Sequence, residues 1–160
     1  PEFDHMILQV ECQADGDNVR WLADVGFGDS FLAPLRLDDR GDQVDGLRAY
    51  RIEHDGDQRW LWERDYDGTW ARQYGFTLQP RHFEEFAAMC DWQQTSPDSS
   101  FAQRQVATLA VPDGRITLRN NRLITTRHGV KRDEPIESDD NYRTLLRTKF
   151  GIELAGRSAG

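Results

Sequence analysis

Short apolar runs separated by turn-forming residues fill the first eighty residues of the chain. Met6–Val10 and Val19–Val25 are largely apolar, and Ala14–Asn18 between them contains an Asp-Gly pair. Two apolar runs on either side of such a turn are typical of a β-hairpin. The pattern therefore predicts a hairpin near the start of the chain.

The same pattern recurs further along. Tyr50–Glu53 and Arg59–Glu63 lie on either side of His54–Asp57, and Asp67-Gly68 precedes a third run, Thr69–Tyr74. Several short strands joined by Asp-Gly turns indicate an antiparallel sheet or a small β-barrel.

The spacing of apolar residues becomes helical near residue 80. Within His82–Trp92, the residues that recur at helical spacing are Phe83, Phe86, Ala87 and Cys90. This spacing places them on one face of a helix. We expect the helix to end before Thr95–Asp98, a turn-forming segment that contains a proline.

Three strands and a final helix are predicted in the second half of the chain. The strand-like runs are Arg104–Ala110, Arg115–Arg119 and Arg122–Arg127, and a Pro-Asp-Gly turn joins the first two. Ser138 precedes two aspartates, as is typical of a helix start, and Gly151 suits a helix end. The chain is predicted to have an α+β fold made mainly of antiparallel β-structure.

The composition narrows the choice of partners. The 160 residues include 20 Lys and Arg against 28 Asp and Glu, which gives a formal net charge of −8. This balance argues against duplex DNA or an anionic membrane as the main partner, because both attract clustered Lys and Arg. No apolar run approaches the ~18 residues that a membrane-spanning helix needs. We expect neither nucleic acid nor a membrane as a partner.

The two cysteines and four histidines point to no metal site. No pair of them shows the spacing of zinc ligands, so we expect no bound metal. Two cysteines form no disulfide framework and fit a reducing compartment. We therefore expect a cytoplasmic location.

One pair of residues suggests chemistry. His5 begins one strand of the predicted hairpin and Asp24 lies near the end of the other, so antiparallel pairing can bring them together. A histidine held by a carboxylate is the general-base part of a nucleophilic triad. A structural interpretation stays open, since a lone histidine at a strand start is often a surface or core residue.

Several segments, in register along the chain, resemble the arylamine N-acetyltransferase family. They are His5–Val10, Leu22–Gly28, Pro34-Leu35, Tyr74–Arg81, Gln94–Phe101 and Pro112–Arg115. The first is similar to the family's strand that opens with the catalytic histidine. The second is similar to its Asp-Val-Gly-Phe-Gly motif, whose aspartate orients that histidine.

The resemblance implies a division into domains. Family members have a helical N-terminal domain with the nucleophilic cysteine, a β-barrel domain with the histidine and aspartate, and an α/β lid. For this chain, the resemblance predicts a β-barrel domain at residues 1–83. At residues 84–160 it predicts an interdomain helix followed by a small α/β lid domain. The family's cysteine motif is absent, and Cys12 and Cys90 suit ordinary structural positions. The chain thus looks like a family member without its first domain, and we expect it to be inactive alone.

The resemblance also implies roles for individual residues. His5 would take the thiol proton, Asp24 would orient His5, and acetyl would pass through cysteine in a ping-pong reaction. The residues similar to substrate- and cofactor-proximal segments are Gly26, Phe27, Gly28, Phe76, Ser96, Ser99, Ser100 and Phe101. Core packing is the alternative for the two aromatic residues Phe27 and Phe76, and turn capping for the serines.

The expected partners follow from the same resemblance. They are acetyl-CoA as a cosubstrate, with no permanently bound cofactor, and an arylamine or hydrazine acceptor, as in xenobiotic metabolism. Without the N-terminal domain, exposed apolar surface on the barrel is expected to cause self-association. Two alternatives stay open: a non-catalytic module that binds CoA or an aromatic ligand, and an amide-forming acyltransferase of natural-product synthesis.

Overall fold

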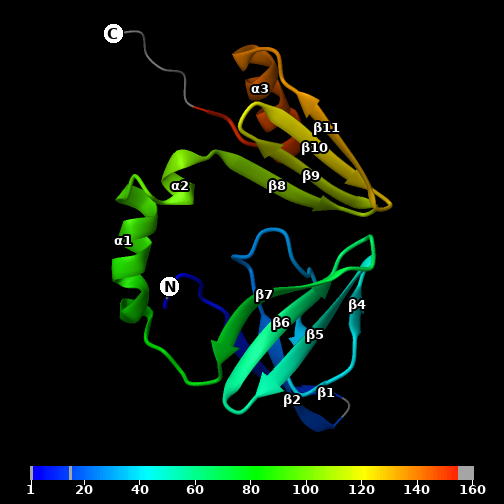
Figure 1. The fold of residues 1–160 in the computed structure, drawn as a ribbon, viewed down its shortest axis with the longest axis vertical. Helices are drawn as coiled ribbons and strands as arrows, with labels where there is room; N and C mark the ends of the chain where they lie inside the picture. The colour runs from blue at the N-terminus through cyan, green and yellow to red at the C-terminus, as the bar shows by residue number, and fades with distance from the viewer. Residues whose placement is uncertain (1, 15, 155–160) are drawn as a thin grey trace. The chain divides into compact units, whose positions relative to one another are not determined.

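Short antiparallel strands dominate the computed structural model, which describes residues 2–14 and 16–154 (Figure 1). The chain divides into two compact units, Pro1–Gln94 and Thr95–Gly160. The predicted α+β class with mainly antiparallel strands is confirmed. The domain boundary after residue 83 stays a prediction.

The first unit contains two antiparallel sheets. One has the order β1-β2-β3, with β1 (Leu8–Ala14), β2 (Asp17–Ala23) and β3 (Leu35–Arg36). The other has the order β4-β5-β6-β7, with β4 (Gln43–Asp45), β5 (Arg48–Asp55), β6 (Gln58–Arg64) and β7 (Trp70–Thr77). Hydrogen bonds between the described strands do not join these sheets into one closed sheet, so the predicted barrel is not shown.

Alternation along the strands builds the core of this unit. Tyr50 and Ile52 of β5 and Leu61 of β6 point to the same face, and each is 0–1% exposed. The core cluster is Leu22, Phe31, Leu35, Leu37, Tyr50, Ile52 and Leu61. On the opposite face of the same sheet, Arg51 stacks on Trp70 at 4.4 Å from the ring centroid. One face of this sheet thus packs against residues from β2, β3 and the loops beside them, and side chains of its own strands stack on the other face.

Short helical segments follow β7. They are η1 (Phe83–Phe86), α1 (Ala87–Thr95) and α2 (Ser100–Gln103). The helix predicted over His82–Trp92 therefore begins as a 3-10 turn and continues as α-helix. The backbone N–H of His82 donates to the carboxylate of Glu85 at 2.7 Å, which satisfies a donor at the start of the turn.

The second unit is a four-stranded meander followed by a helix. Its sheet has the order β11-β10-β9-β8, with β8 (Val106–Val111), β9 (Gly114–Arg119), β10 (Arg122–Arg127) and β11 (Val130–Pro135). After the sheet come α3 (Asp139–Leu145) and η2 (Leu146–Phe150). Ser138 caps α3 by accepting the N–H of Asn141 at 3.2 Å, and Gly151 ends η2 with φ at 68°. The predicted strands and both predicted ends of the last helix are confirmed.

In the described ranges, no helix has the length and apolar character needed to cross a membrane.

The assigned core predicts the effect of truncating Leu61. Leu61 is fully buried, so Leu61→Ala is expected to lower the free energy of unfolding by about 2–5 kcal/mol. Leu47, which is 56% exposed, provides the control: Leu47→Ala is expected to change it by less than about 0.5 kcal/mol. Urea unfolding followed by circular dichroism measures both, and equal losses would contradict the assigned core.

Candidate active site

The β1–β2 hairpin brings His5 and Asp24 together. Leu8 pairs with Ala23 at the open end of the hairpin. The segment that precedes Leu8 and the segment that follows Ala23 therefore start next to each other. His5 lies just before β1 and Asp24 just after β2, and His5 Nε2 is 2.8 Å from Asp24 Oδ2.

The Asp24 carboxylate is buried and fully hydrogen-bonded. Its side chain has no exposed surface, and Oδ2 also accepts the hydroxyl of Tyr74 at 2.7 Å. Oδ1 accepts the backbone N–H groups of Gly26 and Phe27 at 3.0 and 3.1 Å. Burial by itself raises the pKa of Asp24, but the hydrogen bonds from His5, Tyr74 and Phe27 outweigh it and lower the pKa to about 2. Asp24 is therefore ionised at neutral pH.

An ionised Asp24 decides which nitrogen of His5 carries the proton. A carboxylate only accepts hydrogen bonds, so Nε2 of His5 must be the donor. In the neutral imidazole, Nδ1 is then the acceptor and can take a proton from a nucleophile. The loop passes close to this edge of the ring: a Cβ at Gly26 would lie 3.1 Å from His5 Cε1 and 3.6 Å from Nδ1.

Aromatic rings surround the imidazole. The ring centroids of His5, Phe27 and Tyr74 lie 5.3–5.5 Å from one another, and Phe76 lies 6.1 Å from Tyr74. A cavity of about 640 Å³ adjoins His5 and has Phe76 in its lining. Its other apolar lining residues include Leu22, Leu37, Leu78 and Phe86. Polar and charged side chains, among them Asp4, Gln58 and Arg81, also line this cavity, so it is of mixed polarity. A concave space with a few polar groups next to a basic side chain is a common form of small-molecule site.

Comparison with known proteins identifies the family. A model of the N-acetyltransferase family matches residues 1–159. The chain belongs to the arylamine N-acetyltransferase family.

Individual family members match along nearly the whole chain. The arylamine N-acetyltransferase of Mycolicibacterium smegmatis is 31% identical over 162 residues, which cover 98% of this chain and 58% of that protein. The solved structure of the Salmonella typhimurium enzyme has a TM-score of 0.85 at 26% identity, covering 100% of this chain and 58% of its own. The solved structure of the Mycobacterium marinum enzyme in complex with CoA has a TM-score of 0.80 at 27% identity, and it covers 90% of this chain and 53% of its own. The chain thus spans less than two thirds of these relatives.

Tyr74 is a site residue that the sequence alone did not single out. The strand pairing places Tyr74 opposite the buried Leu61, which turns its ring towards Asp24. Burial and the neighbouring Asp24 carboxylate raise the pKa of Tyr74, so its hydroxyl stays protonated and donates. The sequence feature that could have pointed to Tyr74 is its position in Tyr74–Arg81, a segment that resembles the family.

Two of the three serines named from the sequence make capping bonds in the second unit. Ser99 is fully buried, and its Oγ accepts the N–H of Phe101 at 3.2 Å at the start of α2. Ser96 Oγ accepts the N–H of Asp98 at 3.2 Å. Phe101 is 72% exposed, and Ser100 is also exposed. These contacts account for two of the serines as caps, and a role near the cofactor stays a prediction.

The two thiols are exposed and unbridged. Cys12 lies on β1 four residues beyond Leu8, which is about 13 Å further along the strand. The sulfur of Cys90 accepts a hydrogen bond from the Gln94 side chain at 3.0 Å. Among the residues that the structure describes, no hydrogen bond joins either thiol to His5, and no group of three or more His, Cys, Asp and Glu is placed to hold a metal ion.

The low pKa of Asp24 predicts a pH-dependent contribution to stability. Because the pKa falls from 3.8 to about 2 on folding, the contribution is full above pH 3.8 and is lost as the pH falls through about 2. The stability difference between the wild type and Asp24→Asn is expected to shrink by about 2 kcal/mol from about pH 6 to pH 2. Tyr74→Phe should move this loss to higher pH, because it removes one donor.

Urea unfolding at a series of pH values measures both effects. A difference between the wild type and Asp24→Asn that does not vary with pH would contradict the hydrogen-bonded, ionised carboxylate.

Proposed function

We propose that this chain supplies the base and its orienting carboxylate for acetyl transfer from acetyl-CoA to an arylamine or hydrazine. The observation that carries the proposal is the Asp24 carboxylate, which holds His5 through Nε2 and leaves Nδ1 free to act as a base. His5 itself is 22% exposed, so a nucleophile can reach it.

The reaction has two halves. His5 Nδ1 takes the proton of a cysteine thiol, and the thiolate attacks the acetyl carbon of acetyl-CoA. The bond from that carbon to the CoA sulfur breaks, and CoA leaves with the proton from His5. The amine then attacks the acetyl-cysteine, the carbon–sulfur bond breaks, and the proton of the amine returns to the cysteine through His5. Asp24 stabilises the imidazolium in both halves.

The acceptor and the cosubstrate are proposed to bind beside this pair. Phe27 and Phe76 offer aromatic faces for the ring of the acceptor. Gly26 lies close enough to His5 to allow close approach of the backbone, and Gly28 is proposed to do the same. The CoA complex of the Mycobacterium marinum relative supports acetyl-CoA as the cosubstrate. We expect no permanently bound cofactor. Ser96, Ser99, Ser100 and Phe101 are the proposed cofactor-proximal segment.

The nucleophile is proposed to come from outside the 160 residues. Cys12 is too far along β1 from His5, and the sulfur of Cys90 bonds to Gln94. We assign residues 1–83 to the family's β-barrel domain and residues 84–160 to its interdomain helix and lid. We place the reaction in the cytoplasm, where exposed thiols stay reduced.

Complementation tests this function. The chain is mixed with the segment of the Mycolicibacterium smegmatis relative that it does not match, and acetylation of an aniline and of a hydrazide by acetyl-CoA is measured. We expect no turnover from the chain alone and turnover from the mixture. His5→Gln should lower that turnover about 1,000-fold or more, because the base is lost.

His82→Gln, which changes an exposed histidine at the start of η1, is the matched control and should leave turnover unchanged. Turnover by the chain alone that Cys12→Ala or Cys90→Ala abolishes would overturn the proposal.

The exposed face of β1 predicts self-association. Met6, Leu8 and Val10 alternate along the chain and are 43–49% exposed. Leu8 and Val10 belong to β1, an edge strand of the β1-β2-β3 sheet, and Met6 precedes it. We expect a second copy of the chain to cover this face, so that the average mass in light scattering rises with concentration. Leu8→Lys with Val10→Lys should restore the monomer, whereas Val130→Lys, at a residue 64% exposed, should not. A wild type that is monomeric at high concentration would contradict this.

A further inference from the structure

The loop between β2 and β3, residues 24–34, carries much of the candidate site. It contributes the backbone donors of Gly26 and Phe27 to the Asp24 carboxylate, and the Phe27 ring against His5. Within the loop, the N–H of Gly28 donates to the carbonyl of Gly26 at 3.0 Å. The position of the loop therefore decides how well Asp24 is held.

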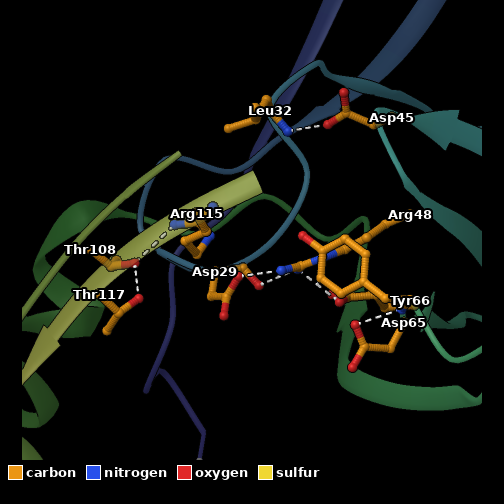
Figure 2. Close-up of polar contacts among 10 residues, drawn as sticks. Asp29, Leu32, Asp45, Arg48, Asp65, Tyr66, Thr108, Arg115 and Thr117 are labelled. Atoms are coloured by element: carbon orange, nitrogen blue, oxygen red, sulfur yellow. Dashed lines mark hydrogen bonds and ion pairs between the residues drawn. The ribbon is translucent and has the colours of Figure 1, made fainter. Parts of the chain in front are cut away.

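Arg48, the first residue of β5, binds the middle of this loop through Asp29 (Figure 2). Its Nη1 donates to the Asp29 carbonyl at 3.1 Å, and its Nη2 donates to Asp29 Oδ1 at 2.6 Å. Nη1 also donates to Glu63 Oε1 at 2.9 Å, and the ring of Tyr66 lies 5.1 Å from the guanidinium. The Arg48 and Glu63 side chains are only 11% and 9% exposed, so the bond between them is shielded from solvent.

The same hairpin holds the loop at a second point. Asp45, the last residue of β4, pairs with Arg48 across the β4–β5 turn. Its Oδ2 accepts the N–H of Leu32 and, at 3.3 Å, that of Ala33. Figure 2 shows both attachments, one through Arg48 and one through Asp45. The loop is thus fixed to a strand pair that belongs to the core sheet.

We infer that Arg48 is a positioning residue for the candidate active site. By holding Asp29, it fixes the loop and with it the Gly26 and Phe27 donors that keep Asp24 aligned on His5. The inference rests on the proposed function only where it treats His5 as a catalytic base. The contacts that position the loop all lie within the first unit. Lysine cannot replace Arg48, because a single ammonium cannot reproduce the planar fork that serves both Asp29 and Glu63.

Amide hydrogen exchange measured by NMR on the 160-residue chain tests this inference. In Arg48→Met and Arg48→Lys, exchange at Gly26 and Phe27 is expected to be about tenfold faster or more, because the loop opens more often. Exchange at the core amides of Ile52 and Leu61 is expected to keep its wild-type rate. Arg20→Met is the matched control: it breaks an exposed ion pair with Asp38 and should leave Gly26 and Phe27 unchanged.

Two results would overturn the inference. One is wild-type exchange at Gly26 and Phe27 in Arg48→Lys, which keeps the charge and most of the packing and so is expected to fold even if Arg48→Met does not. The other is an equal acceleration at Ile52 and Leu61, which would mean general destabilisation. Exchange does not involve turnover, so failure of the complementation assay would leave this result intact and would contradict the proposed function alone.

Discussion

The candidate site depends on one buried charge. The Asp24 carboxylate has no exposed surface, and a charge removed from water costs several kcal/mol unless its hydrogen bonds are replaced. The replacements come from three separate segments: the segment that precedes β1, the loop after β2, and strand β7. Each segment must hold its place for the charge to be tolerated, so the hairpin, the loop and the core sheet are all tied to this one group.

The buried Asp24 carboxylate also determines how His5 can act as a base. An ionised acceptor at Nε2 fixes the imidazole proton, and the other nitrogen becomes the base that a cysteine enzyme needs. A Cβ at Gly26 would lie 3.1 Å from His5 Cε1, so glycine lets the loop approach the imidazole without displacing the ring. The same loop is attached to the core sheet through Arg48 and Asp45. The site and its support lie within the first unit, on strands with a well-buried core.

The sequence predicted the strands and the His5–Asp24 pair wherever a local pattern of apolar residues and turn formers was present. The hairpins followed from Asp-Gly turns between apolar runs, and the closeness of His5 and Asp24 followed from antiparallel pairing. Strands without such signals were missed. Leu35–Arg36 and Gln43–Asp45 are too short to show alternation, and Val130–Pro135 is exposed along its whole length.

The supporting residues of the site could not be read from local patterns. The partner of Tyr74 depends on the pairing of β6 with β7, where a register shift lies between Leu61 and Trp62. A one-residue shift exchanges the two faces of a strand, and alternation alone does not locate it. Arg48 resembles an ordinary exposed strand residue in the sequence, and its role becomes visible only when Asp29 and Glu63 are brought to it.

The role of Asp24 in orienting His5 is tested most directly by the protonation state of the His5 ring nitrogens, observed by ¹⁵N NMR of the chain at a pH where the ring is neutral. A single tautomer is expected, with the proton on Nε2 towards Asp24 and none on Nδ1. A proton on Nδ1, or the averaged signals of an imidazole that exchanges between tautomers, would contradict it.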